Sequence, residues 1–434
     1  MTGSSVAESE FVLALSGDGD ADPMRMGAKA ANLVALRRAG LPTPGGLCLS
    51  AAAYRVQTAA LGLDESIERY AVVDPIEQRR LSVEIRLKLY EQPIAPHILT
   101  PLLKAFGSQR AAGSGKCAIR SSALIEDQQG ASFAGQFESF LGVDDEAAYL
   151  TAVRACWAAL WTSNARRMME SHGLSPASTA MAVIVQPLIE ARVSGGGLSK
   201  TAQGEMLISA TWGLGSAIAQ GEVVPDRITL SKQGFLRTIE AGRKDHRATC
   251  VHVEGPATVA VASDLVSAPC LDAAQAVTLG RLMRKAATVM GCPVEIEWAL
   301  DDTGFKLLQA RPLTVEPVTV PDEMWLKHPG LSGHPAGIGW GAGRAVVVNC
   351  ECELARVAPG DVLVTRVAGP ALSVVLPRLA GLVAELGGST SHLASLARER
   401  GIPTVLGVLD ATRRIPDGSQ VAVDGVAGIV RWMA

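Results

Sequence analysis

The stretch MGAKAANLVALRRAGLPTP, near the start of the chain, has the pattern of an amphipathic helix. Leu33 and Leu36, together with several alanine residues, can share one face of such a helix. The glycine and proline of the GLP segment predict where it ends. Lys29 then lies in the first helical turn, two residues after Gly27.

Alternating apolar and polar residues predict strands in two other stretches. In CPVEIEWALDDTGFKLLQARP, Glu295 and Glu297 are two residues apart and so point to the same face of a strand. After the DDTG turn, Gln309 and Arg311 alternate in the same way, which predicts a hairpin with polar groups on one face. The run AVIVQPLI is typical of a buried strand that ends near Gln186.

The C-terminal part predicts a compact β/α domain. Short β-rich segments, among them GDVLVTRV, AGLVAEL and SQVAVDG, are separated by turns, with helices between some of them. The segment QARPLTVEPVTVPDEMWLKHPG precedes them, and its closely spaced prolines favour an extended connector. We therefore predict a first domain at residues 1–315, a proline-rich linker at 316–333 and a second domain at 334–434.

Composition narrows the class of protein further. The 434 residues are 48% hydrophobic and 19% charged, as in a folded α/β protein, and the formal net charge is −3. The chain has no long basic run, so we expect neither nucleic acid nor a membrane as a partner. It shows no signal-peptide pattern and no uncharged apolar run of about 18 residues. We expect a cytoplasmic protein whose scattered cysteines, including Cys350 and Cys352, are free thiols.

One histidine stands in a distinctive setting. In GGSTSHLASLARERGIPTV, Ser391 or Thr390 can cap the helix that follows, and a glycine and a proline end it. His392 then lies in the first turn, beside free backbone N–H groups and the positive end of the helix dipole. This setting favours a neutral, nucleophilic imidazole, and the same N–H groups would hold a phosphoryl group on it. From local chemistry alone, a surface histidine in a capping region is the alternative.

Other polar groups suit phosphates and Mg²⁺. The predicted hairpin face offers the oxygen ligands that Mg²⁺ prefers, beside an arginine that can bind phosphate in a bidentate manner. The segment KCAIRSSALIEDQQGASFAGQ places Arg120 at the end of an apolar strand, before a loop that can wrap phosphates. The strand ending at Gln186 can hold an adenine edge through backbone hydrogen bonds. From spacing alone, a solvated hairpin face, an ordinary loop, a plain core strand and a solvated Lys29 remain the alternatives.

In their order along the chain, these motifs resemble the family of pyruvate phosphate dikinase, phosphoenolpyruvate synthase and rifampicin phosphotransferase. MGAKAANL…AGLPTPGG is similar to the family's opening nucleotide motif, and IRSSALIEDQQGASFAGQ to its phosphate loop. WGLGSAIAQGEVVPD, EIEWAL and LLQARPLT follow, and GGSTSHLASLARERGIPTVLG closely matches the mobile phosphohistidine domain. The resemblance covers nearly the whole chain. It implies an α/β (α+β) fold, with an ATP-grasp nucleotide-binding domain followed by a small swivelling β/β/α phosphohistidine domain.

The resemblance also implies roles for single residues. His392 would carry the phosphoryl group as the catalytic residue. The ATP-binding residues by motif position would be Lys29, Arg120, Gly135, Ser139, Gln186, Glu297, Gln309 and Arg311. Glu297 and Gln309 would hold Mg²⁺, with Glu295 beside them as a further metal ligand.

Three positions depart from the family's pattern, and they bear on the fine nucleotide contacts. Glu295 stands where the family usually has Asp, which adds a methylene group. Ser216 stands where a GLGE pattern has Glu, and Gly197 stands where SGVxFT would continue. We also expect no pyruvate- or phosphoenolpyruvate-binding barrel after Ala434 and no antibiotic-binding domain in the connector.

The resemblance implies an AMP-forming phosphotransferase that uses ATP and Mg²⁺. ATP would phosphorylate His392, and the phosphoryl group would pass to an acceptor, giving AMP, phosphate and a phospho-acceptor. We expect a small-molecule acceptor bearing a hydroxyl, amine or amide, with a separate acceptor protein, as in a split dikinase, as one alternative. A non-catalytic phosphocarrier and an ATP-grasp ligase that releases ADP are the others. The nucleotide product, AMP, ADP or none, separates these classes.

Overall fold

The computed structural model describes residues 10–18, 21–125, 137, 139–250, 256–315, 325–366 and 369–433. The chain divides into two compact units. Unit 1 comprises Met1–Ile189, Cys250–Ala257 and Lys306–Arg311, and unit 2 comprises Glu190–Thr249, Thr258–Phe305 and Pro312–Ala434. The boundaries of these units differ from those of the three predicted segments. The predicted boundaries stay a prediction.

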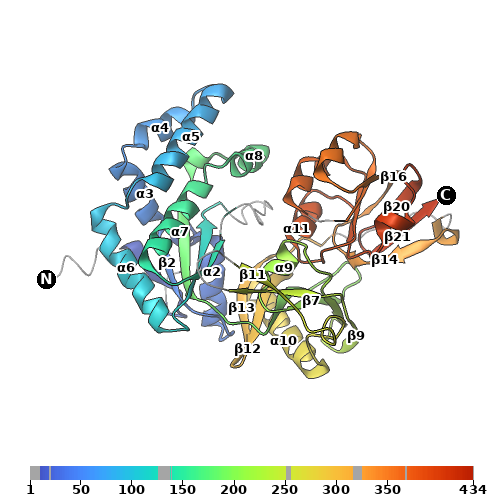
Figure 1. Cartoon of the computed structure of the whole chain (residues 1–434). Coiled ribbons are helices and arrows are strands. Elements are labelled where there is room, and N and C mark those ends of the chain that lie inside the picture. The colour runs from blue at the N-terminus through green and yellow to red at the C-terminus, as the bar shows by residue number, and fades with distance from the viewer. Residues whose placement is uncertain are drawn as a thin grey trace. The chain divides into compact units, whose positions relative to one another are not determined.

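A mixed α/β layer structure forms unit 1. Its central sheet has the strand order β1-β2-β5-β3-β4, with β5 antiparallel to both β2 and β3. Helix α2 covers one face, where its Met26 and Val34 pack with Ile184 of β5 (Figure 1). The strands are β1 (Val12–Ala14), β2 (Leu47–Leu49), β3 (Cys117–Ala123), β4 (Ser139–Val143) and β5 (Met181–Pro187), and α2 spans Pro23–Arg38.

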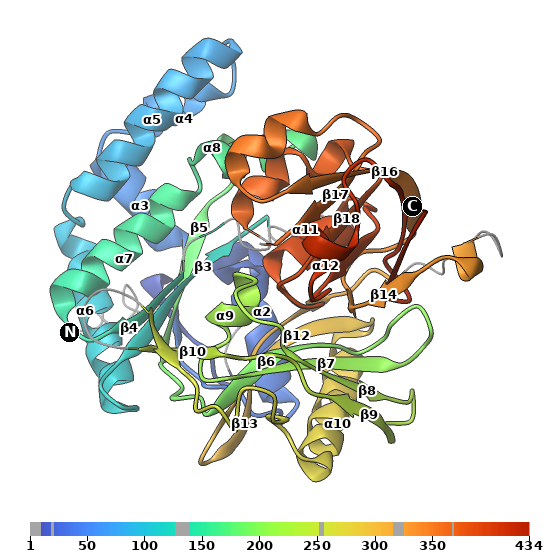
Figure 2. The ribbon, with the colours of Figure 1, turned by 45° about the vertical axis from the view of Figure 1, so that its right-hand side comes forward.

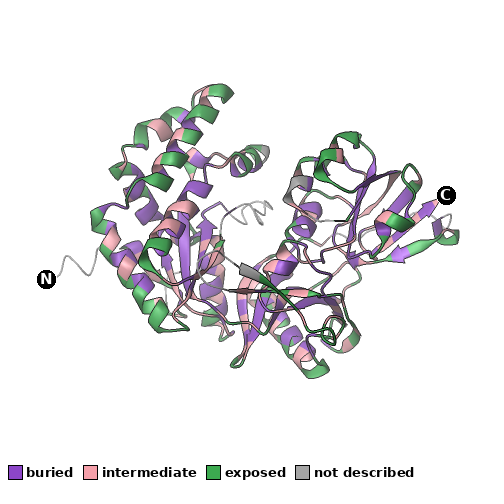
Figure 3. Ribbon diagram, in the orientation of Figure 1, coloured by how far each residue is buried: buried purple, intermediate pink, exposed green. Residues whose placement is uncertain are grey.

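The other face of this sheet supports the larger apolar core. Ile119 and Val185 point into that core, where they meet Trp157. Figure 3 shows the inner strands β3 and β5 mostly in purple, because both are buried along almost their whole length. The remaining helices of unit 1 are α3 (Ala51–Ala60), α4 (Asp64–Tyr70), α5 (Pro75–Glu91), α6 (Pro96–Ala111), α7 (Glu146–Ala159), α8 (Ser163–Ser171) and the 3₁₀ turn η1 (Pro176–Ser178).

The predicted helix around Lys29 is confirmed, and its kink has a clear cause. Gly27 has φ +75° inside α2, so the helix that carries Lys29 starts afresh after it. A Cβ atom at Gly27 would lie 2.4 Å from the carbonyl oxygen of Ser122 on β3. Glycine therefore permits both the left-handed backbone and the close approach of α2 to the sheet.

The first part of unit 2 is an antiparallel sheet with a long helix against it. Its strands run in the order β12-β6-β7-β8-β9, and α10 packs against them (Figure 2). The bounds are β6 (Val193–Leu198), β7 (Met206–Trp212), α9 (Ser216–Ala219), β8 (Asp226–Leu230), β9 (Leu236–Glu240), β10 (His246–Cys250), β11 (Pro256–Ala260), α10 (Ala273–Met290) and β12 (Val294–Asp301). The next strand, β13 (Gly304–Pro312), pairs with β12, and its residues Lys306–Arg311 belong to unit 1. The two strands predicted on either side of the DDTG turn are thus present as β12 and β13.

The second part of unit 2 is the predicted compact β/α domain. Strands β16, β17, β18 and β19 run parallel, and β20 and β21 extend the sheet antiparallel beyond β16. Residues alternate between two cores: Leu363 and Leu382 meet Leu393 of α11 on one face, while Val364 and Val383 meet Val421 on the other. The strands are β14 (Gly330–Ser332), β15 (His334–Pro335), β16 (Trp340–Val348), β17 (Val362–Thr365), β18 (Gly381–Ala384), β19 (Thr404–Leu406), β20 (Gln420–Asp424) and β21 (Ile429–Met433).

Short helices connect these strands. They are η2 (Trp325–Lys327), η3 (Glu351–Arg356), η4 (Pro370–Val374), η5 (Leu376–Arg378), α11 (His392–Glu399) and α12 (Ala411–Arg414). Within the predicted linker, residues 316–324 lie outside the described residues. The rest of it is ordered, since β14 pairs antiparallel with β21.

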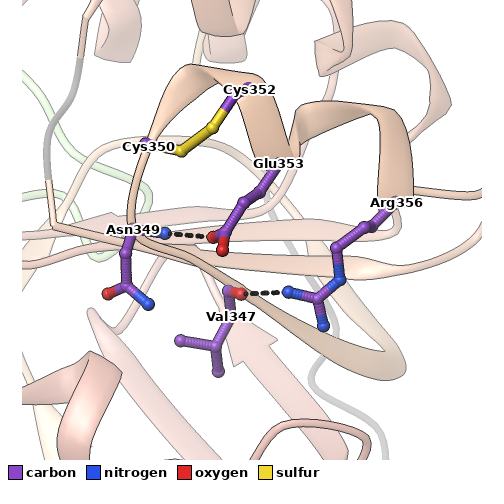
Figure 4. The surroundings of a disulfide bond; sticks show 6 residues. All are labelled: Val347, Asn349, Cys350, Cys352, Glu353 and Arg356. Carbon is purple, nitrogen blue, oxygen red and sulfur yellow. Dashed lines mark hydrogen bonds between the residues drawn. A yellow bond between two sulfur atoms is a disulfide. The ribbon is translucent and has the colours of Figure 1, made fainter.

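The expectation of free thiols is wrong for one pair of cysteines. Cys350 and Cys352 form a disulfide at the start of η3 (Figure 4). The backbone N–H of Asn349 donates a hydrogen bond to Glu353 beside it. The 3₁₀ turn brings the Cα atoms of the two cysteines to 5.4 Å, which is within disulfide range. Five others, Cys48, Cys117, Cys156, Cys270 and Cys292, are free.

In the described part of the chain, no helix is long and apolar enough to cross a membrane.

Candidate functional site

Arg120 and Gln309, two of the residues predicted to bind nucleotide, meet in unit 1. The Arg120 guanidinium donates to the side-chain oxygen of Gln309 and to the carbonyl of Leu308, both at 2.8 Å. Arg120 lies on β3 and its two acceptors lie on β13, so the strand pattern of each segment aims these groups at one another. These two hydrogen bonds tie the guanidinium of β3 to β13.

Lys29 approaches the same strand. Its ammonium group donates to the carbonyl of Ser121 at 3.3 Å, next to Arg120 in sequence. One turn further along α2, the Asn32 side chain donates to the carbonyl of Ala310 at 3.0 Å. The predicted phosphate-binding residues of α2, β3 and β13 therefore gather at one place in unit 1, with Arg311 next to Ala310 on β13.

Ser139 and Gln186 lie on the same face of the sheet as Arg120. Arg120 is paired directly with Ser139 of β4, and Ala118 with Gln186 of β5. Because cross-strand neighbours share a face, all three side chains lie on the side covered by α2. The buried Gln186 side chain donates to the carbonyl of Gly45 at 2.6 Å. The remaining predicted residue of this loop, Gly135, lies outside the described residues.

The two predicted carboxylates of β12 differ in their surroundings. Glu297 is exposed, whereas only 7% of Glu295 is exposed. The Glu295 carboxylate accepts from the Arg398 guanidinium at 2.8 Å and lies 3.5 Å from the Ser395 hydroxyl. Arg398 and Ser395 belong to α11, so this carboxylate is engaged by the helix that begins at His392.

His392 occupies the predicted position at a helix mouth. It is the first residue of α11 and is exposed, and the Ser391 hydroxyl caps the helix by accepting from the N–H of Ala394 at 3.2 Å. The helix ends at Glu399, and Gly401 follows with φ +66°. Two buried hydroxyls directly before the cap, those of Ser389 and Thr390, have no hydrogen-bond partner among the described residues. These hydroxyls are donors that a phosphoryl group near His392 can use.

Arg398 fixes the loop in front of His392, and sequence reasoning did not find this role. Besides Glu295, the guanidinium donates to the carbonyl of Ser389 at 2.5 Å and to the Ser395 hydroxyl at 3.3 Å. Its side chain is 10% exposed and that of Glu295 is 9% exposed, so the ion pair is shielded from water. In the sequence, only the RER segment of the histidine motif pointed to Arg398, because its partner Glu295 lies 103 residues away.

The face of β12 that carries both glutamates lies against the His392 loop. Glu297 is paired with Gly196 of β6, so the two residues share a face. A Cβ atom at Gly196 would lie 2.4 Å from Cβ of Thr390. Only glycine allows this close approach, which brings the loop and α11 onto the face with the predicted metal ligands.

Two family models match the chain. The model for pyruvate phosphate dikinase, AMP/ATP-binding domain, matches residues 24–325. This chain belongs to that family. The model for the PEP-utilising enzyme, mobile domain, matches residues 357–428, which include His392. The mixed α/β fold, with an ATP-grasp-like domain and a PEP-utiliser mobile domain, agrees with the prediction.

The curated relatives that match this chain are longer than it is. A phosphoenolpyruvate synthase of Aeropyrum pernix is 32% identical over 93% of this chain and 56% of its own length. A probable phosphoenolpyruvate synthase of Methanothermobacter thermautotrophicus is also 32% identical, over 93% of this chain and 61% of its own length. A phosphoenolpyruvate synthase of Pseudomonas aeruginosa is 30% identical, over 96% of this chain and 57% of its own length. The chain thus spans little more than half the length of these relatives.

The donor groups fit Mg²⁺ bound jointly with phosphates. In the described residues, no group of three or more His, Cys, Asp or Glu side chains is arranged to hold a metal ion by itself. Magnesium in nucleotide sites usually takes one or two carboxylates and completes its shell with phosphate oxygens and water. The exposed carboxylate of Glu297 is a ligand of the type that such a site uses.

Proposed function

We propose that this chain is an ATP-dependent phosphotransferase of the dikinase type, in which His392 carries the phosphoryl group between two half-reactions. The observation that carries the proposal is the placement of His392. It is an exposed imidazole at the capped N-terminus of α11, in a chain whose residues 24–325 match an AMP/ATP-binding family. Free N–H groups at a helix N-terminus stabilise phosphate oxygens.

The first half-reaction forms a bond between an imidazole nitrogen of His392 and the β-phosphorus of ATP. The bond from that phosphorus to the α-phosphate oxygen breaks, and AMP leaves. Water then removes the outer phosphate, so that one phosphoryl group stays on His392 and one phosphate is released. Lys29, Arg120 and Arg311 would balance the charge that spreads over the phosphate oxygens in this step. Mg²⁺, when bound at Glu297 and Gln309, with Glu295 as a further candidate ligand, would supply additional charge neutralisation.

The contacts of α11 support an arrangement in which the phosphohistidine domain is docked on the sheet of β6 and β12 during this first step. The loop before His392 and the helix after it lie on the face of β6 and β12 that bears Glu297. We infer that the ion pair between Glu295 and Arg398 belongs to this arrangement. It would open when the phosphohistidine domain turns toward the acceptor, and Glu295 would then be released for other ligands.

The second half-reaction passes the phosphoryl group from His392 to an acceptor. The nitrogen–phosphorus bond breaks, an acceptor oxygen or nitrogen takes the phosphoryl group, and the acceptor's proton leaves to water or to the imidazole. We favour a small molecule bearing a hydroxyl, amine or amide as the acceptor. An acceptor site on a separate polypeptide, as in a split dikinase, is the second candidate.

Nucleotide analysis separates this function from its alternatives. The purified chain is incubated with ATP and Mg²⁺, and the nucleotides are resolved by chromatography. The proposal predicts AMP in amounts equal to the protein, together with a phosphate on the protein that is labile in acid and stable in alkali. Release of ADP instead would point to a ligase, and no nucleotide turnover would point to a non-catalytic role. Turnover of the phosphoprotein only after a second protein is added would favour the split dikinase over the small molecule.

A further inference from the structure

The disulfide at the start of η3 joins two exposed residues. Cys350 and Cys352 are both exposed, and the one residue between them, Glu351, is exposed as well (Figure 4). A thiol in solution can therefore approach the bond. Disulfides that are exposed in this way are the labile, regulatory or catalytic ones, whereas structural disulfides resist reduction.

This bond adds little to the stability of the fold. A disulfide stabilises a protein mainly by constraining the unfolded chain, and the effect grows with the length of the loop that it closes. Here the loop contains a single residue. The neighbouring backbone also has other contacts, since the N–H of Asn349 donates to the Glu353 carboxylate at 2.8 Å. The Arg356 guanidinium donates to the carbonyl of Val347 at 3.2 Å (Figure 4). We therefore expect the folded protein to survive reduction of the bond.

Other cysteines of the chain have the opposite properties. Cys48, Cys117 and Cys270 are buried free thiols. Burial raises the pKa of the Cys117 thiol to about 11, although the charge of Arg110 opposes this, and burial also raises the pKa of Cys270. These thiols are poor nucleophiles at neutral pH, because the thiolate is the reactive form. A chain with free thiols is typical of a reducing compartment, where the disulfides that do form are usually transient, and catalytic or redox-sensing.

The charge around the bond favours one class of reaction partner. Glu351 lies between the two cysteines and Glu353 follows them, both in the first turn of η3. The thiolate that attacks a disulfide is negative, and a further negative group on the same molecule would add to the repulsion by these carboxylates. The bond therefore favours a thiol or dithiol whose other groups are neutral or positive.

We propose that Cys350 and Cys352 form a thiol–disulfide exchange site that takes electrons from a neutral or cationic dithiol. A thiolate of the dithiol forms a mixed disulfide with one cysteine, and the other cysteine leaves as a thiolate. The second thiol of the partner then attacks the mixed disulfide and releases the first cysteine. The protein gains two electrons and two protons and holds two thiols, and the dithiol becomes a disulfide. This site does not involve ATP or His392 and does not depend on the proposed function.

Reduction also releases the first turn of η3. The N–H of Glu353 donates to the carbonyl of Cys350 at 3.0 Å, so this hydrogen bond lies across the same turn as the disulfide. Leu354, the next residue, packs against the apolar core that contains Leu393 of α11. The released turn is thus part of the packing around the helix that carries the phosphohistidine.

Differential alkylation tests the exchange site. The intact chain, prepared without reductant, is equilibrated with mixtures of reduced and oxidised dithiothreitol in native buffer. Free thiols are blocked with N-ethylmaleimide, the remaining cysteines are labelled with its deuterated form after unfolding and reduction, and the peptides are analysed by mass spectrometry. We expect Cys350 and Cys352 to become reduced together and to reoxidise when the ratio is reversed. The buried Cys117 is the internal control and should take up only the deuterated label at every ratio.

Two results would overturn the proposal. One is a bond that stays oxidised until urea unfolds the chain, and the other is a pair that remains reduced at every ratio.

Two small thiols of opposite charge test the chemistry of the partner. Cysteamine carries an ammonium group and 3-mercaptopropionate a carboxylate, and they are compared at equal thiolate concentration and low salt. We expect cysteamine to open the bond roughly three- to ten-fold faster, and Glu351→Gln to reduce this difference. Glu65→Gln, at an exposed position of α4, is the matched control and should leave the difference unchanged. Equal rates for the two thiols would contradict the preference for a neutral or cationic partner.

Hydrogen–deuterium exchange measures the release of the turn. The amide of Glu353 should exchange roughly ten-fold faster after reduction, while the ladder between β17 and β18 stays protected. The double variant Cys350→Ser/Cys352→Ser should exchange like the reduced chain and should not respond to dithiothreitol. Unchanged exchange on reduction would contradict the release. These readouts need no nucleotide, so failure of the proposed function would not be mistaken for failure of this site.

Discussion

Replacing Gly196 by alanine tests whether docking of the His392 loop on β6 matters for phosphorylation. The added Cβ would lie 2.4 Å from Cβ of Thr390 and 2.6 Å from both Cγ2 and Oγ1. Contacts this short force the loop away from the strand. Overpacking costs about 1–3 kcal/mol. The ratio of docked to undocked protein should then fall roughly 5- to 150-fold.

Hydrogen–deuterium exchange measures the docking directly. We expect faster exchange in residues 389–391 of Gly196→Ala, while the ladder of β6 with β12 and β7 stays protected. In the same protein, single-turnover labelling of His392 by ATP should slow once the undocked form predominates, with nucleotide binding unchanged.

Two further variants make this result specific. Adding Thr390→Gly to Gly196→Ala removes all three of the closest atoms and should restore docking, as measured by hydrogen–deuterium exchange. Gly107→Ala, in α6, adds a Cβ with no atom within 4 Å and should change neither docking nor labelling. If Gly196→Ala shows the same hydrogen–deuterium exchange and the same labelling of His392 as the parent protein, the docked arrangement is not the one in which His392 reacts.

The other predictions concern the nucleotide site, the ion pair of α11 and the pH dependence of stability. Glu297→Ala and Arg311→Ala should abolish labelling of His392 while far-ultraviolet circular dichroism stays native; normal labelling would show that these residues do not hold metal or phosphate. Arg398→Met removes the guanidinium from a buried ion pair, so denaturant titration should show a loss of about 3–5 kcal/mol in the free energy of unfolding, and an unchanged midpoint would refute the pair's importance. Burial, and secondarily the charge of Arg227, lower the pKa of His334 to about 4, and a hydrogen bond to the carbonyl of Pro225 opposes this. As the pH falls below about 6.5, His334 takes up a proton in the unfolded chain before it does so in the folded protein. The free energy of unfolding should therefore rise by up to roughly 3 kcal/mol from about pH 4 to about pH 6.5, and level off at higher pH. His334→Gln should flatten that part of the stability profile in urea titrations, and an unchanged slope would contradict the assignment.

Local patterns predicted those features that depend on neighbours in sequence. The helix after Gly27, the strands that carry Glu297 and Gln309 and the capped helix at His392 all follow from spacing and capping residues, and all are confirmed. The meeting of Arg120 with Gln309 was expected only from the family resemblance. The two residues are 189 positions apart, and no periodicity relates them.

Features that depend on tertiary packing were missed. The different surroundings of Glu295 and Glu297 arise because α11 covers one of them through Arg398, which nothing in the strand pattern indicates. The disulfide was missed because two cysteines with one residue between them suggest no link until the 3₁₀ turn brings them together.

The most direct test of the central claim is the fate of the β-phosphate of ATP. The chain is incubated with Mg²⁺ and ATP labelled at the β-phosphate, digested under alkaline conditions, and the labelled peptide is sequenced by mass spectrometry. The account predicts that the label is retained on His392, that a label at the γ-phosphate is released as inorganic phosphate, and that His392→Ala retains neither. Equal labelling of His392→Ala, or retention of the γ-label in place of the β-label, would contradict a dikinase-type phosphohistidine in this protein.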